Sequence, residues 1–528
     1  MRTAFLGQNK TKLIISLVII ETAFLVLSIP YHKLNGDEAW FAEESYFMSR
    51  NGYSTSNLFA GFVKEDVRVV VQHKLFIYMG AALFKLLHYD LWVFRLIPML
   101  SFILLMGLLI RHEGKHLSGT TQAQMFLSIA LVLSMHEPFY FAKIARPEML
   151  VTLLGFLSYY LLRKYFELER VWLVCLAGFA AGMAMLAHLN GLIFVATGFL
   201  FLLLPMSGSS VPKRIRASAL FGVFAVVAFT PYLFDVYRHC DIFALQISSP
   251  LIEAKTHFTI LKPVLNLLRE HERLFRKPEI IVPSALFLFC LAANWRKLLN
   301  GDVRHLTMYT SLLMIFLGIV VEDKQIKYST YLVPFWGILI AKSITTMDKK
   351  NKVIFSTTAV LMSLLFATAL YWQAASIFEK ENYPPLNASI AKYIPPKSTC
   401  VAPMNFIFNE IANYRILSDY LVGYEKFGDV IDAKSLSDFC RKNRCEYVVF
   451  NRYGDSWEYV HDYSDTVKLL KNFEIVAANN SFAVLKYGDD SPKEPTNGNE
   501  PGDRMAVQRY ISYMEHRAMA DGKLADRR

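Results

Sequence analysis

Residues 75–87, LFIYMGAALFKLL, are the stretch on which the topology of the whole chain depends. A helix needs about 20 apolar residues to cross a bilayer, and this run has only 13. We therefore expect it to lie at the membrane surface or to re-enter the bilayer rather than to span it. If it did span, every basic loop that follows it would change sides of the membrane.

The composition of the chain is that of a polytopic membrane protein. Of its 528 residues, 54% are hydrophobic and 19% are charged, and the mean hydropathy is +0.30. Typical soluble domains have about 25% charged residues, so a disordered or fibrous protein is excluded and an ordinary cytosolic enzyme is disfavoured. Eleven apolar runs fit a membrane span, at residues 13–29, 96–110, 122–141, 148–162, 171–187, 190–206, 217–234, 279–295, 306–321, 329–343 and 353–375.

The short loops between these runs indicate which side of the membrane each one faces. With the N-terminus in the cytoplasm and residues 75–87 not spanning, the inside loops are residues 111–115, 163–170, 213–216, 296–304 and 342–352. All of them are basic, as the positive-inside rule requires. The same distribution accounts for the net charge of +11, so we expect no nucleic-acid partner.

We therefore expect a mostly α-helical membrane protein of about eleven transmembrane helices with a small C-terminal extracytoplasmic α/β domain. Residues 1–375 form the transmembrane domain, in which residues 31–94 are a first external loop and residues 235–278 a second. Residues 376–487 form the external domain, and residues 488–528 are a disordered, polar tail by composition.

The α/β prediction for the external domain rests on a change of periodicity. Short β-rich runs stand at residues 399–403, 446–450 and 482–487, separated by helical stretches such as residues 433–443.

Two cysteines of this external domain, Cys440 and Cys445, are separated by four residues. They form either a disulfide or two free thiols.

Asp37 and Glu38 lie in the segment GDEAW, directly after the first span. A carboxylate beside a water-excluding surface can accept a proton from an attacking hydroxyl or amine. Alternatively, Asp37 or Glu38 caps the following helix, because acidic residues favour a first helical turn.

Several cations are expected at the same external surface: Lys74, Arg95, Lys143, Arg146 and Lys327. An Arg side chain can bind a phosphate through two parallel N–H donors, and a Lys side chain can bind it through its compact positive charge. Some of them, Lys143 above all, could instead extend to lipid headgroups. An acid and several cations at one membrane surface indicate a lipid-linked anionic substrate and an acceptor that must lose a proton.

His188 and Asn190 interrupt an otherwise apolar stretch, as ligands or as hydrogen-bond partners between helices. Ionisable residues at membrane depth are costly, and each is therefore a functional candidate.

Six segments follow one another in a recognisable order: DEAWFAEESYFMSRNG (37–52), QHKLFIYMGAALFKLL (72–87), FRLIPMLSF (94–102), FAKIARPEMLVTLLGFLSYYLL (141–162), AGFAAGMAMLAHLNGLIF (177–194) and KQIKYSTYLVPFWGILIA (324–341). Together they resemble the GT-C fold membrane glycosyltransferases of the glycosyltransferase 39 group, which includes protein O-mannosyltransferases and aminoarabinose transferases. The resemblance covers about residues 10–345.

The resemblance implies transfer of a sugar from a polyprenyl-phosphate donor to a lipid, glycan or protein acceptor at the outer face of the inner membrane. The family's first-loop acid acts on the acceptor nucleophile, and that role carries to Asp37, with Glu38 as the substitute. Relatives carry an acid near Glu148, which makes it a second carboxylate candidate. One-step attack would invert the anomeric carbon.

The resemblance also implies a donor-phosphate site. Arg95 matches an Arg that opens the second span, and Lys327 and Tyr328 match a late basic-aromatic pair; Arg146 is a further candidate. Relatives have a basic residue before two prolines where this chain reads His73-Lys74-Leu75, so the basic role falls to Lys74, which we prefer, or to His73. Relatives often carry Lys where His188 stands, and His188 and Asn190 are further pocket candidates.

We expect no obligatory metal or cofactor, because no His, Cys or Asp cluster has ligand spacing, and a divalent cation near Asp37 and Glu148 stays an alternative. The expected partners are the donor, the acceptor and membrane lipids. A lipid-linked sugar flippase or transporter is the competing hypothesis. It predicts two-fold repetition and broken helices at the bilayer midplane, and neither is evident. A receptor with a membrane anchor would leave the acidic loop unexplained.

Overall fold

The computed structural model describes residues 2–28, 34–71, 73–113, 119–205, 210–248, 261–298, 303–347, 383–424, 433–451, 472–479 and 481–488. The described residues form two compact units. The helical unit contains residues of Met1–Lys33, Val70–Leu83 and Trp92–Phe378. The mixed unit contains residues of Leu34–Val69, Phe84–Leu91 and Glu379–Arg528.

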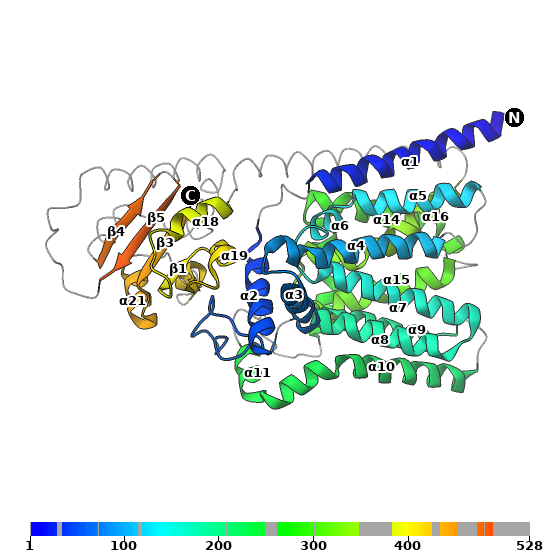
Figure 1. The fold of residues 1–528 in the computed structure, drawn as a ribbon. Coiled ribbons are helices and arrows are strands. Elements are labelled where there is room, and N and C mark those ends of the chain that lie inside the picture. The colour runs from blue at the N-terminus through cyan, green and yellow to red at the C-terminus, as the bar shows by residue number, and fades with distance from the viewer. Residues whose placement is uncertain are drawn as a thin grey trace. The chain divides into compact units, whose positions relative to one another are not determined.

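Long helices lie side by side in the helical unit (Figure 1). Its elements are α1 (Arg2–Ser28), α3 (Lys74–Leu86), α4 (Leu91–Glu113), α5 (Gly119–Ser134), α6 (His136–Phe141), α7 (Glu148–Leu168), α8 (Val171–Ala187), η2 (Leu189–Gly191), α9 (Leu192–Leu203), α10 (Val211–Arg238), α11 (Cys240–Ile247), α12 (Lys262–Leu268), α13 (Glu270–Phe275), α14 (Pro278–Leu298), α15 (Arg304–Val320), η4 (Ile326–Tyr331) and α16 (Val333–Thr346).

The helical unit contains a close contact between the backbones of α8 and α10, and α10 lies along its border (Figure 1). Gly178 and Gly182 are four residues apart on α8, one turn above the other. A Cβ atom at Gly178 would collide with the carbonyl of Phe221, and one at Gly182 with that of Ala225. Small residues at this spacing are what lets two membrane helices approach closely.

Two described helices, α4 and α10, are long and apolar enough to cross a membrane, and the bent pair Lys262–Phe275 and Ile280–Arg296 would make a third if it is one span. Others, such as α8 and α15, are shorter apolar helices. The mostly helical fold is confirmed, whereas the number of eleven spans stays a prediction. The run 353–375 lies outside the described residues.

The element boundaries agree with the sequence in some places and differ in others. The helix α3 has 13 residues, as short as its apolar run. The run 122–141, expected as one span, is two helices, because α5 ends at Ser134 and Met135 is extended before α6. Pro138 contributes to the break, because it has no N–H to donate to the carbonyl of Ser134.

The mixed unit is built on a five-stranded sheet in the order β2-β1-β3-β5-β4. Strands β2, β1 and β3 are parallel, and β3, β5 and β4 are antiparallel. The side chains of Val401, Val448 and Val484 are fully buried in the sheet. The elements are α2 (Gly36–Asn51), α18 (Tyr383–Ala391), β1 (Thr399–Ala402), η5 (Met404–Phe406), α19 (Ile407–Glu410), β2 (Arg415–Ser418), α20 (Asp419–Tyr424), α21 (Ala433–Asn443), β3 (Tyr447–Asn451), β4 (Phe473–Ala478) and β5 (Phe482–Tyr487).

The three expected strands and the helix at 433–443 are present, and the sheet has two further strands, β2 and β4. The helix α2 and the segment after it also belong to this unit, since the N–H of Ser418 donates to the carbonyl of Leu58 at 3.0 Å. The division into residues 1–375, 376–487 and 488–528 stays a prediction, and residues 489–528 lie outside the described part.

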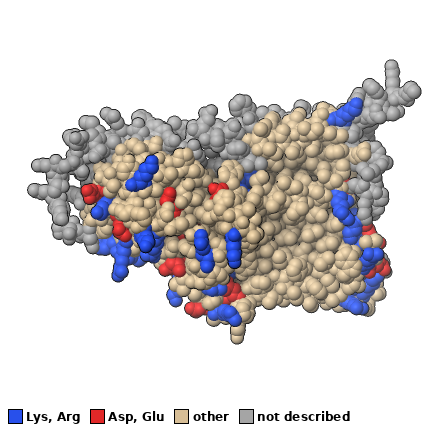
Figure 2. All heavy atoms as spheres, in the orientation of Figure 1, with Lys and Arg blue, Asp and Glu red and all other residues tan. Residues whose placement is uncertain are grey.

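The visible face of the helical unit is a broad surface without charged side chains (Figure 2). Charged residues gather at one edge of this unit (Figure 2). The ion pairs of the helical unit include Lys213 with Glu169 at 3.0 Å and Arg163 with Glu167 at 3.3 Å. Large apolar side chains are exposed along its helices, among them Ile103, Leu104, Val226, Val227, Phe234 and Phe289. An exposed apolar surface bounded by charges is what a bilayer-embedded helix bundle presents.

Candidate functional site

The helical unit contains a polar cluster, which we define as His73, Arg146, Glu148, His188, Lys327 and Tyr328; Arg146, Glu148 and Tyr328 are buried, and the other three are partly buried. It is assembled from the start of α3, the N-terminus of α7, the α8–η2 junction and η4.

Arg146 and Glu148 form the ionic core of the polar cluster. Nη2 of Arg146 donates to Oε1 of Glu148 at 2.8 Å, and Nε lies 3.2 Å from both carboxylate oxygens. Glu148 is fully buried and Arg146 is 7% exposed. Glu148 is also the first residue of α7, where the helix dipole favours a negative charge.

Aromatic rings form the second part of the polar cluster. The imidazoles of His73 and His188 stack with centroids 4.3 Å apart, and the ring of Tyr328 meets His188 edge-on at 5.8 Å. The backbone N–H of Asn190 donates to Nδ1 of His188 at 3.0 Å. A neutral His188 therefore carries its proton on Nε2.

The cluster carries a net positive charge. Burial lowers the pKa of His73 to about 4, with Glu148 opposing and Lys327 adding to the effect. Burial, His73 and Lys327 hold the pKa of His188 well below its usual value. With both imidazoles neutral, the cations Arg146 and Lys327 face one carboxylate, which leaves a charge of +1.

Arg273 is a further cation beside the polar cluster that the sequence did not single out. Its Cζ lies 6.0 Å from the ring centroid of Tyr328, and Nζ of Lys327 lies 5.1 Å from the same ring. Arg273 is fully buried. It belongs to the long stretch 235–278, and its sequence neighbours give no sign that it meets η4.

His73 and Lys74 are adjacent but have different surroundings. Lys74 pairs with Asp235 of α10, with Nζ 2.6 Å from Oδ2, and both side chains are less than a tenth exposed. Nε2 of His239 lies 3.9 Å from the other oxygen of Asp235. His73 is thus the member of this pair that lies in the polar cluster.

Arg95 and Lys143 form a second buried basic site. Cζ of Arg95 lies 5.3 Å from the ring of Trp92, and Nζ of Lys143 donates to Oγ of Ser28 at 2.8 Å. Burial and the charge of Arg95 lower the pKa of Lys143 to about 7. Lys143 is 3% exposed, so its ammonium group is held inside the protein and does not extend to headgroups.

Asp37 and Glu38 lie in the first turn of α2, in the mixed unit. The N–H of Asp37 donates to Oδ1 of Asn35, and the N–H of Asn35 donates to Oε2 of Glu38, both at 3.0 Å. This reciprocal arrangement is a capping box. Glu38 therefore has the helix-capping role that was the alternative to chemistry, while Asp37 is partly exposed.

The mixed unit also contains buried carboxyl groups that the sequence did not reveal. Glu43 accepts hydrogen bonds from the hydroxyl of Ser56 at 2.6 Å and from the N–H groups of Asn57 and Leu58. Burial raises the pKa of Glu43 to about 8, and burial together with the charge of Glu43 raises that of Glu65 to about 8. These contacts attach residues 56–58 to α2.

The candidates thus fall into two groups: Asp37 and Glu38 belong to the mixed unit, and the others to the helical unit. Joint action of the two groups stays a prediction. Among the described residues, no three His, Cys, Asp or Glu side chains are arranged to hold a metal ion. Cys440 and Cys445 are buried free thiols.

No family model matches the sequence, and no protein with a curated description matches it. Solved structures do match. ArnT from Cupriavidus metallidurans bound to undecaprenyl phosphate is 12% identical, with 91% of this chain and 99% of that chain covered and a TM-score of 0.60. The apo structure of ArnT is 13% identical, covers 90% and 98%, and has a TM-score of 0.57. The chain therefore has the GT-C fold that the sequence resemblance predicts.

Proposed function

We propose that this protein is a membrane glycosyltransferase that transfers a sugar from a polyprenyl-phosphate donor to a lipid, glycan or protein acceptor. The observation that carries the proposal is the polar cluster with its excess positive charge, in a fold shared with an ArnT that binds undecaprenyl phosphate. The reaction would take place at the outer face of the inner membrane, with the N-terminus in the cytoplasm.

The donor phosphate would bind to the basic groups of the helical unit. Lys327 and Arg146 supply charge within the cluster, Tyr328 can donate a hydroxyl hydrogen bond, and Lys74 and Arg95 are further candidates. Cations in a low-dielectric site stabilise the negative charge that develops on a departing phosphate. No metal is needed for this step, although a divalent cation stays an alternative.

Asp37 is the candidate base on the acceptor. Asp37 is partly exposed, whereas Glu38 and Glu148 are fully buried, the first in the cap of its own helix and the second beside Arg146. In the proposed step, Asp37 takes the proton of the acceptor while the acceptor oxygen or nitrogen bonds to the anomeric carbon. The bond from that carbon to the phosphate oxygen breaks with inversion, and the electron pair leaves with the phosphate.

The test compares the purified wild type with Asp37→Asn and Asp66→Asn, using polyprenyl-phosphate sugars, outer-membrane glycolipid and mass spectrometry. Asp66 is an exposed residue of the same mixed unit and serves as the matched control. We expect hexose, pentose or amino-sugar addition by the wild type and Asp66→Asn, and its loss in Asp37→Asn with donor binding retained.

Transfer that survives in Asp37→Asn would contradict the base assignment and move it to Glu148 or Glu38. Failure of the wild type to transfer any sugar, together with movement of the lipid-linked sugar across vesicle membranes, would contradict the enzyme proposal and favour a flippase.

A further inference from the structure

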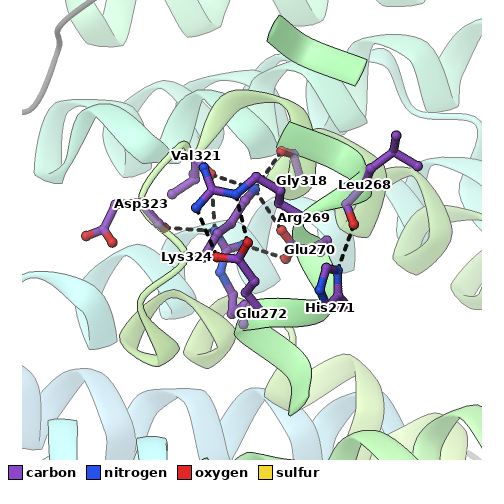
Figure 3. A network of polar contacts seen from close by, with 10 residues as sticks. Leu268, Arg269, Glu270, His271, Glu272, Gly318, Val321, Asp323 and Lys324 are labelled. Carbon is purple, nitrogen blue, oxygen red and sulfur yellow. Dashed lines mark hydrogen bonds and ion pairs between the residues drawn. The ribbon is translucent and has the colours of Figure 1, made fainter. Parts of the chain in front are cut away.

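A buried ionic network connects α13 to the loop before η4 (Figure 3). Glu270 is at its centre and uses both carboxylate oxygens. Nη1 of Arg273 lies 2.6 Å from Oε1, and Nζ of Lys324 lies 3.0 Å from Oε2. Two segments about fifty residues apart in sequence are thereby held together.

The two cations also bind the backbone around the end of α15. Nζ of Lys324 donates to the carbonyls of Gly318 at 2.9 Å and Val321 at 3.0 Å. Nη2 of Arg273 donates to the carbonyls of Val321 at 3.2 Å and Asp323 at 3.1 Å. Carbonyls at a helix C-terminus lack helical partners, so cations there satisfy them and also favour the helix dipole.

Glu270 is the counter-ion shared by both cations. The side chains of Arg273 and Lys324 are 0% and 2% exposed, and that of Glu270 is 12% exposed. Without the carboxylate, two buried positive charges would lose the counter-ion that they share, which is strongly unfavourable. The conformation of the loop at residues 321–325 therefore depends on Glu270.

This loop leads directly into the polar cluster. Lys324 precedes Lys327 by three residues, and Arg273 faces the ring of Tyr328 at 6.0 Å. We propose that Glu270 is a positioning residue, which fixes Lys327 and Tyr328 through Lys324 and Arg273 so that they face the donor phosphate. The inference rests on the proposed function, since it names a residue that acts on the same site.

The helix α13 contains a matched control. Glu272 also pairs with an arginine, Arg269, at 2.8 Å, but both side chains of this pair are exposed, at 31% and 56%. Among the described residues, Glu272 accepts its side-chain hydrogen bonds from Arg269, three residues away on the chain. Glu270→Gln and Glu272→Gln thus make the same chemical change in one helix. Glu270 contacts the loop at residues 321–325 through Lys324, whereas Glu272 pairs with Arg269.

The first experiment measures kcat and the donor KM of both variants with undecaprenyl-phosphate sugar. We expect Glu270→Gln to raise the donor KM about tenfold and Glu272→Gln to stay within about twofold of the wild type. Equal donor KM values for the two variants would overturn the proposal.

A double-mutant cycle separates positioning from a general structural role. If Glu270 acts through Lys327, Glu270→Gln should cause little further loss of kcat/KM in a Lys327→Met background. If Glu270→Gln lowers kcat/KM by the same factor in the Lys327→Met background as in the wild type, the proposal is overturned. If Glu270→Gln does not fold, Glu270→Gln/Lys324→Met removes one charge of each sign. A folded double variant with the wild-type donor KM would likewise contradict it.

Hydrogen exchange tests the inference without any activity. We expect the amides of residues 322–331 to exchange faster in Glu270→Gln than in Glu272→Gln, and equal exchange would overturn the positioning role. If the wild type transfers no sugar from any donor, the proposed function fails, whereas this exchange measurement still decides whether Glu270 fixes η4.

Discussion

Two adjacent residues at the start of α3 have different electrostatic partners, and the sequence motif alone does not show which partner each residue has. His73 directly precedes α3 and Lys74 is the first residue of the helix. His73 stacks on His188 in the polar cluster, and Lys74 pairs with Asp235. The candidates of the cluster could be named from sequence, but Asp235 and Arg273 could not, because only folding brings them to α3 and η4.

We expect Lys74→Met to lower the free energy of unfolding by about 3–5 kcal/mol, because it leaves Asp235 as a buried charge without this partner. Lys74→Met/Asp235→Leu should recover most of that loss. Thermal unfolding in detergent, with donor binding measured on the same samples, checks both. A stable Lys74→Met that no longer binds donor would show that Lys74, rather than His73, has the phosphate role.

Glu43 should make the stability of the protein pH-dependent. Its folded pKa of about 8 lies above the ordinary value of 4.5, so the unfolded chain releases the proton first as pH rises. Its contribution is therefore complete below pH 4.5 and falls between pH 4.5 and 8. Glu43→Gln, which has no such proton, should gain stability relative to the wild type over that range. A difference in unfolding free energy that does not change with pH would contradict this.

Among the elements, helix boundaries followed the sequence where a run of apolar residues ended in clear signals. The helix α8 occupies the predicted residues 171–187. The strands followed the sequence less completely, because β1, β3 and β5 were predicted whereas β2, the four residues Arg415–Ser418, and β4 were not. The case of β2 shows why. It is a strand because β1 pairs with it, which is a long-range effect.

The contact of α8 with α10 predicts opposite outcomes for the same substitution at two glycines. Gly182→Ala should destabilise the protein by about 1–3 kcal/mol, since its methyl group meets the carbonyl of Ala225. Gly107→Ala, in α4, meets nothing within 4 Å and should stabilise by up to about 1 kcal/mol through helix propensity. Unfolding curves of the two variants would test this, and equal shifts would contradict it.

For the whole molecule, ion pairs of the helical unit join two stretches that the sequence predicts on the same side of the membrane, while the orientation itself stays a prediction. Lys262 pairs with Glu322 at 2.8 Å and Glu270 with Lys324 at 3.0 Å, which brings the stretches 235–278 and 322–328 together. Both were expected outside the membrane. The sequence predicted this shared face from the basic loops alone, but it could not show which side chains join the two stretches.

The exposed thiol of Cys240 is a native reporter of that topology. We expect a membrane-impermeant maleimide to label it in intact spheroplasts, with Cys240→Ser as the control for other thiols. Labelling that requires permeabilised membranes would place residues 235–278 in the cytoplasm and would mean that α3 crosses the bilayer.

The glycines of α8 also limit how a long isoprenoid chain can reach such a site. Where Gly178 and Gly182 meet α10, backbone lies against backbone, with no side chains that could rotate aside. A passage for hydrocarbon can open only where rotamers can change, so the seam between α8 and α10 stays shut to lipid. We therefore expect the isoprenoid tail of the proposed donor to run along helices that pack through larger side chains, and not between α8 and α10.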